Sequence, residues 1–160
     1  MMLTMLVKFL IVYYSLHLGV NPHYCLAVAH VESRDLKNNM EFRVGRLGKS
    51  KYYGPMGIHQ DFRKLRPEVL ENNIVAGVRA LGRVPLERYN ASCTQAYKKA
   101  IRHFTKKYAS DRETKDMINF LSKRKGNPHK LFRQFIELKC NAPTHLCLLT
   151  TLAASPRSPL

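Results

Sequence analysis

The stretch GVNPHYCLAVAHVESR, residues 19–34, has the composition of a buried helix that ends on an acid. Leu26 is typical of its core-forming residues. Asn21 before Pro22 is a typical helix start, because the Asn side chain caps free N–H groups and proline needs no N–H in the first turn. Glu32 then stands at the inner end of this apolar helix, and the rest of the sequence must explain why.

Length and charge limit the classes of protein that fit. The chain has 160 residues, 45% of them hydrophobic, which is enough for one domain with a core. The net charge is +16, and residues 98–139 hold thirteen Lys or Arg against four Asp or Glu. This half is either a solvated helix face or a surface for a polyanion, such as nucleic acid or an anionic cell-wall polymer.

The first twenty residues, MMLTMLVKFLIVYYSLHLGV, are apolar but interrupted. Lys8 comes too late for the charged start of a signal peptide, and no small-residue cleavage site follows, so there is no clear signal peptide. Polar residues also break the run that a membrane span needs. We predict an amphipathic first helix over residues 3–18. Its inner face carries Leu6, Leu10, Tyr13 and Tyr14.

The patterns further along predict a mainly α fold with a small β-hairpin near residues 41–53. Helices are expected at 22–33, 67–71, 73–81, 91–109, 112–124 and 128–139. The helix within 91–109 has one apolar stripe and one basic face. Its stripe consists of Tyr97, Ile101, Phe104 and Tyr108. We expect one domain over 1–140, with a basic extension at 109–140, and a loose tail at 141–160.

Several site types are missing from the sequence. The four cysteines match no zinc pattern, and neither a phosphate-binding loop nor a metalloprotease motif is present. We therefore predict no metal and no cofactor. Cys25 is expected as a buried thiol, and a Cys140–Cys147 disulfide stays open as an alternative.

Glu32 has the residue type and the surroundings of a general acid. A carboxyl group beside apolar side chains loses hydration, which raises its pKa and lets it hold a proton near neutral pH. Such a proton can be given to the leaving oxygen of a glycosidic bond. The competing interpretation is that Glu32 is an ordinary surface residue at a helix end.

Four short segments follow one another in an order that favours the first interpretation. They are AVAHVES with Glu32-Ser33, YYGPMGIHQ with Gly54-Pro55-Met56-Gly57-Ile58-His59-Gln60, NNIVAGVRAL with Asn73, Ile74, Gly77 and Leu81, and RYNAS with Tyr89-Asn90-Ala91. In this order the chain resembles the lytic transglycosylase (SLT-type) family, which has a lysozyme-like orthogonal helical fold. The resemblance covers residues 10–108.

The resemblance implies cleavage of peptidoglycan between N-acetylmuramic acid and N-acetylglucosamine, with a 1,6-anhydro product and Glu32 as general acid and base. It implies no second catalytic carboxylate and no metal. Ser33 would orient Glu32, the phenol of Tyr89 would reach the catalytic carboxylate, and Asn90 would hold an N-acetyl group or a loop. The expected partners are peptidoglycan glycan strands and other anionic wall polymers, with the protein a monomer and no specific nucleic acid.

The Gly-rich segment has its own physical logic. Gly54 and Gly57 allow a positive φ or a close approach of backbone to a sugar. Met56 and Ile58 would line an apolar wall, and Gln60 would hydrogen-bond substrate amides. The segment can also be aligned with family members that have Gly-Pro-Leu-Gln-Ile. In that alignment Gly57, and not Gln60, stands at the position of the family glutamine. Outside this segment, Asn73 reads as a helix cap and Gly77 as a site of close helix packing.

Other functions remain open at this stage. A goose-type lysozyme, which hydrolyses the same bond, needs a carboxylate to activate water, and Asp35, Glu41 and Asp61 are the nearby acids. A basic nucleic-acid-binding protein and an inactive glycan-binding relative are further alternatives. The proposed substrate lies in the cell wall, so the protein would act in the periplasm, outside the cell or after delivery by a phage.

Overall fold

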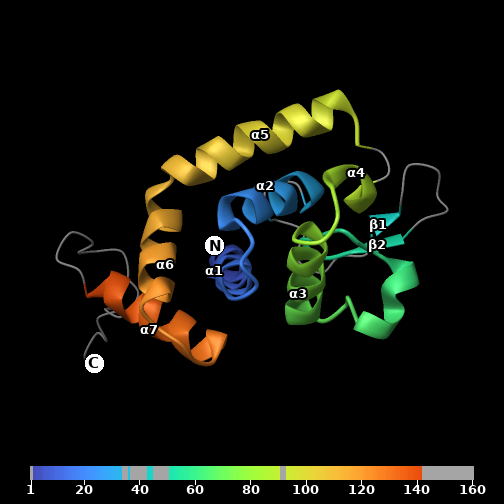
Figure 1. Ribbon diagram of the computed structural model, residues 1–160. Helices are drawn as coiled ribbons and strands as arrows, with labels where there is room; N and C mark the ends of the chain where they lie inside the picture. The colour runs from blue at the N-terminus through green and yellow to red at the C-terminus, as the bar shows by residue number, and fades with distance from the viewer. Residues whose placement is uncertain (1, 34–35, 37–42, 45–50, 91–92, 142–160) are drawn as a thin grey trace, which may run out of the picture.

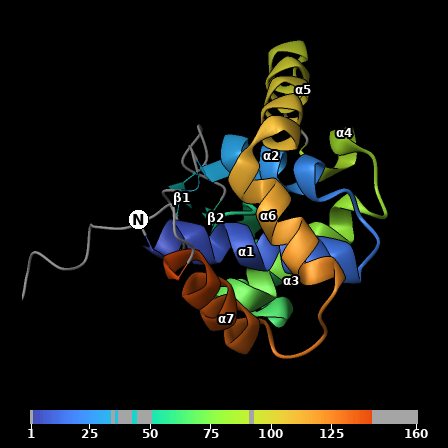
Figure 2. The same cartoon turned by 90° about the vertical axis from the view of Figure 1, so that its left-hand side faces the viewer.

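The fold is arranged around the first helix in the computed structural model, which describes residues 2–33, 36, 43–44, 51–90 and 93–141. Helix α1 (Met2–His17) lies in the middle and contacts α2, α3, α6 and α7. Figures 1 and 2 show these helices on different sides of α1. The described part of the chain is mainly helical with a small antiparallel sheet, which confirms the predicted fold class at that level.

Helix α1 is buried around its whole circumference over its central turns. Val7, Phe9, Leu10, Ile11 and Val12 are all fully buried. The helix was expected to be amphipathic, and that expectation is wrong, because neighbours cover several of its faces. Among the described residues, none of the helices combines the length and the apolar character that crossing a membrane requires.

The central position of α1 explains its one lysine. The ammonium of Lys8 contacts Asp111 Oδ2 at 2.6 Å and Glu113 Oε2 at 2.7 Å, at the start of α6 (Arg112–Ser122). Two carboxylates compensate for the desolvation of this buried charge. Lys8 therefore joins α1 to α6.

Helix α2 (Pro22–Ser33) begins as predicted. The Asn21 Oδ1 atom accepts hydrogen bonds from the backbone N–H groups of His23 and Tyr24, at 2.9 and 3.2 Å. The helix packs along α5 (Gln95–Ser110), the long helix at the top of Figure 1. This contact places the end of α2, which carries Glu32, beside the start of α5.

Each of the three helices in the described part of the second half of the chain begins after a residue whose side chain caps it. Thr94 caps α5, Asp111 caps α6, and Asn127 caps α7 (Pro128–Cys140). The predicted apolar stripe of α5 is confirmed: Ile101 and Tyr108 are buried, while Tyr97 and Phe104 pack partly against the core.

Between α2 and α5 the chain forms helices α3 (Leu70–Leu81) and α4 (Leu86–Tyr89). The sequence predicted two helices, 67–71 and 73–81, where the structure has α3 alone. Val69 is the N-cap of α3, so Asn73 lies inside the helix and is not its cap. The side chain of Asn73 bonds instead to the neighbouring turn, as described below.

The predicted hairpin is present in its described part. Strand β1 (Arg43–Val44) pairs antiparallel with β2 (Lys51–Tyr53), whereas residues 41–42 and 45–50 lie outside the described chain. A third strand, β3 (Ile58–His59), pairs with β2 and was not predicted. The 3-10 helix η1 (Gln60–Leu65) follows directly. The Gly-rich segment therefore forms the tight connection between β2 and β3.

Candidate active site

The site is built around the half-buried carboxylate of Glu32, at the end of α2. Its Oε1 atom accepts a hydrogen bond from the Tyr97 hydroxyl at 2.6 Å and another from the Asn90 side-chain amide at 3.0 Å. Tyr97 comes from the first turn of α5, and Asn90 follows α4. Three separate segments thus meet at one carboxylate oxygen and fix its direction.

The other carboxylate oxygen faces the Gly-rich turn. Gly57 has a φ of +61°, and a Cβ atom there would lie 2.7 Å from Glu32 Oε2. The missing side chain is therefore what lets the turn approach the carboxylate so closely. Within the described residues, Oε2 accepts no hydrogen bond, so this oxygen is the one left to contact a ligand.

The side chain of Asn73 stabilises the Gly-rich turn through three hydrogen bonds. This fully buried side chain accepts a hydrogen bond from the Met56 N–H at 3.0 Å and donates to the carbonyls of Tyr53, at 2.8 Å, and Pro67, at 3.1 Å. Gly54, with a φ of +65°, leaves the room, because a Cβ atom there would lie 2.6 Å from the Asn73 amide. Asn73 is a structural residue that connects α3 to both sides of the turn.

Met56 anchors the same turn in the core. Its side chain is fully buried, and a Cβ atom on Gly77 of α3 would come within 2.5 Å of it, which confirms close packing at Gly77. Ile58 is also buried, at 8% exposure. The expectation that Met56 and Ile58 line a substrate wall is therefore wrong; both side chains belong to the core and support the turn from inside.

Tyr89 does not hold Glu32, contrary to expectation. Its hydroxyl donates to the Met56 carbonyl oxygen at 2.5 Å, because α4 places the ring beneath the Gly-rich turn. Burial, and then the negative charge of Glu32, raise the pKa of Tyr89 well above its usual value. The phenol stays protonated and fixes the turn that faces the carboxylate.

Tyr97 makes the hydrogen bond to Glu32 that was expected of Tyr89. The sequence pattern predicted Tyr97 only as a member of the apolar stripe of α5. Burial raises the pKa of Tyr97 most, followed by the charge of Glu32 and the hydrogen bond to it. Tyr97 is consequently a permanent donor to Glu32. The available signal for a hydrogen-bonding role was the hydroxyl group of Tyr97, at the first position of a stripe that mainly forms core.

The other predicted site residues have varied placements. Ser33 is buried and donates its hydroxyl to the Ala29 carbonyl at 2.5 Å, within its own helix, so it closes α2 and makes no bond to Glu32. Asn90 contacts Glu32 directly, a role that was not foreseen. Gln60 begins η1, and its side chain lies outside what the structure describes.

Helix α5 is fixed to α2 by a buried aromatic contact. His30 stacks on Phe104 with 3.7 Å between ring centroids, and its Nδ1 atom lies 2.9 Å from the Tyr108 hydroxyl. His30 is two residues before Glu32, and both partners belong to the helix that carries Tyr97. The contact therefore sets the distance between the carboxylate and its donor.

Of the three acids that a hydrolase could use beside Glu32, the structure describes Asp61. The Asp61 carboxylate is 77% exposed and lies 3.1 Å from His59 Nδ1. Asp35 and Glu41 lie outside the described residues. Across the described ranges, no group of three or more His, Cys, Asp or Glu side chains could hold a metal ion.

The cysteines of the described chain are free thiols. Cys25 is a buried thiol, as predicted, and burial raises its pKa to about 11, so it stays protonated in the core. Cys93 and Cys140 are also free thiols. The Cys140–Cys147 alternative involves a residue outside the described chain.

Comparison of the chain with models of protein families, with curated proteins and with solved structures found no match.

Proposed function

We propose that this protein is a peptidoglycan lytic transglycosylase with a lysozyme-like helical fold, in which Glu32 is the general acid and base. One observation carries the proposal: Glu32 Oε1 is held by two neutral donors, while Oε2 faces the Gly57 turn and accepts no hydrogen bond from the described residues. A single oriented carboxyl group with one oxygen left for the substrate is the arrangement that this reaction requires.

The first step uses the proton on Glu32. The carboxyl group donates it to the oxygen between N-acetylmuramic acid and N-acetylglucosamine, and the bond to the muramoyl anomeric carbon breaks. The N-acetyl group of the substrate itself stabilises the cation-like centre, so no second carboxylate is needed. Tyr97 and Asn90 then stabilise the ionised Glu32 that remains, because both donate to Oε1.

The second step returns the proton. The Glu32 carboxylate removes the proton from the muramoyl 6-hydroxyl, whose oxygen attacks the anomeric carbon and closes the 1,6-anhydro ring. Glu32 is protonated again, and no water has been consumed. The rigid support of the site by Asn73, Tyr89 and Met56 serves this exchange, since the same carboxyl group must serve two substrate oxygens in turn.

Digestion of purified peptidoglycan with the protein, followed by mass analysis of the soluble fragments, tests the proposal. We expect fragments with anhydro ends, each one water lighter than the hydrolysed equivalent. Glu32→Gln should lower the rate by orders of magnitude while leaving the fold intact, since it keeps the shape and removes the proton donor. Asp61→Asn is the matched control: this exposed carboxylate contacts His59, and a transglycosylase that uses Glu32 alone should keep its activity in this variant.

Two results would contradict the proposal. Fragments with reducing ends would identify a lysozyme, with water as the attacking group. Cleavage that survives Glu32→Gln would remove Glu32 from the chemistry altogether.

A further inference from the structure

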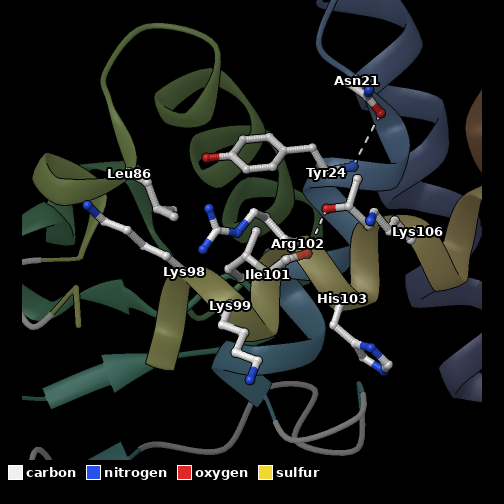
Figure 3. Close-up of a pocket in the computed structure, with 10 residues that line it drawn as sticks. Asn21, Tyr24, Leu86, Lys98, Lys99, Ile101, Arg102, His103 and Lys106 are labelled. Carbon is white, nitrogen blue, oxygen red and sulfur yellow. Dashed lines mark hydrogen bonds between the residues drawn. The ribbon is translucent and has the colours of Figure 1, made fainter. Parts of the chain in front are cut away.

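A groove of about 850 Å³ is lined by α5, the start of α2 and α4 (Figure 3). Its apolar lining consists of Tyr24 from α2, Leu86 from α4 and Ile101 from α5. The remaining lining is mostly basic and comes from α5. A ligand for this groove therefore needs apolar carbon atoms on one side and negative charge on the other.

The basic side of the groove is a regular row. Lys98, Arg102 and Lys106 follow one another at steps of four, so they lie along one face of α5 at intervals of about 6 Å. The Lys98 ammonium is neutralised by Glu87 Oε1 at 2.5 Å. Within the described chain, Arg102 and Lys106 form no ion pair, and both are exposed. Their charges are available to a ligand.

The spacing and the chemistry of this row favour a thin, linear polyanion. A guanidinium binds phosphate through two parallel N–H bonds, which suits Arg102 to a phosphodiester. Methylene carbons between successive phosphates fit the apolar floor. Nucleic acid fits less well, because single strands bind on successive aromatic rings, and Tyr24 is the one Phe, Tyr or Trp among the described residues of the groove.

We infer that this groove binds the phosphodiester-linked polyol chains that are attached to peptidoglycan in bacterial walls. The inference rests on the proposed function and extends it to a second wall component. The row begins at Lys98, next to Tyr97, so one helix serves both the catalytic carboxylate and the groove. A polymer bound here keeps the protein beside the glycan strand to which that polymer is linked.

The test measures binding of the full-length protein to purified poly(glycerol phosphate), end-labelled with a fluorophore, by anisotropy at about 0.15 M salt. The double variant Arg102→Gln, Lys106→Gln should weaken binding at least tenfold. The matched control, Lys125→Gln with Lys130→Gln, removes the same charge at exposed positions outside the groove and should change binding less than twofold. Tyr24→Leu, with its fold checked by circular dichroism, should also weaken binding.

Three outcomes would overturn the inference: equal weakening by the groove and control variants, tighter binding of single-stranded DNA of the same charge, or no polymer binding at all. The proposed function fails separately. Digestion of walls stripped of phosphodiester polymer depends on Glu32 but not on the groove. Groove-dependent binding without anhydro products would therefore contradict the catalytic proposal alone.

Discussion

Tyr97 and Tyr89 both bring a phenol close to Glu32, but their hydroxyl protons go to different acceptors. Tyr97 donates to the carboxylate, and Tyr89 donates to the backbone carbonyl of Met56. Both pKa values are raised, so both groups remain donors. The two residues therefore offer a matched pair, in which the same substitution removes either a bond to the reacting group or a bond that supports it.

Tyr97→Phe should reduce turnover of peptidoglycan by about 10- to 100-fold, equivalent to about 1.4–2.7 kcal/mol, because the carboxylate loses its shortest donor. Stability should change by less than about 1 kcal/mol, since the ring packing is retained. Tyr89→Phe should instead lower the free energy of unfolding by about 1–3 kcal/mol, because a buried carbonyl loses its donor. Initial rates and urea unfolding of both variants check this; unchanged turnover in Tyr97→Phe would contradict the role given to it.

The sequence predicted the structural roles of some single residues but not of others. The positive φ of Gly54 and Gly57 could be predicted, because a short local pattern carries that requirement; the catalytic role of Glu32 stays a prediction. Tyr97 could not, since helical periodicity records only that a ring faces inward, and its acceptor lies 65 positions earlier in the chain. Asn73 was misread because its three bonds are tertiary, and only the folded turn supplies their partners.

For helices and strands, the starting residues were predicted better than the contacts with other elements. Asn21 and Asn127 mark the starts of α2 and α7 as predicted, through contacts within one turn, whereas α5 begins after its Thr94 cap and not at residue 91 as expected. The burial of the central turns of α1 was missed, because its covering helices come from distant parts of the chain. Strand β3 was also missed, since two residues carry no periodicity and depend on pairing with β2.

The joint between α1 and α6 has a pH dependence that follows from its charges. Burial acts to raise the pKa of Asp111, but hydrogen bonds from Lys8 and Thr114 and the charge of Lys8 outweigh it, and the pKa lies below its usual value. The stabilisation is therefore complete above about pH 4, the unfolded pKa, and is lost as the pH falls through the lower folded pKa.

Asp111→Asn tests this joint, because asparagine still caps a helix but carries no charge. The loss of unfolding free energy relative to the wild type should be largest near pH 7 and should shrink toward about pH 2. Urea unfolding at both pH values measures it. Asp116→Asn, at a surface pair with Lys139, is the control and should show a smaller difference. A loss that is the same at both pH values would show that Lys8 does not bind the ionised form.

In the whole molecule, the basic side chains and the groups that hold Glu32 are different residues. The net charge is +16, and much of it lies on α5, on α7 and at residues 123–125 between α6 and α7, whereas the two donors to Glu32 are neutral side chains. Under the proposed function, long-range attraction of an anionic wall and orientation of the Glu32 carboxylate would thus depend on different groups. Salt weakens the first strongly, because screening shortens from about 10 Å at 0.1 M to about 3 Å at 1 M, and leaves short hydrogen bonds largely unaffected.

Raising the salt from about 0.1 to 1 M should therefore lower binding to isolated cell walls at least tenfold, measured by sedimentation of the Glu32→Gln variant with the walls. Turnover of soluble, peptide-free glycan fragments by the wild type, at saturating concentration, should change less than about twofold over the same range, because neutral donors hold Glu32 through short hydrogen bonds that salt does not screen. A parallel fall in both quantities would mean that the basic helices take part in holding the scissile bond. In that case the charge would belong to the catalytic site itself.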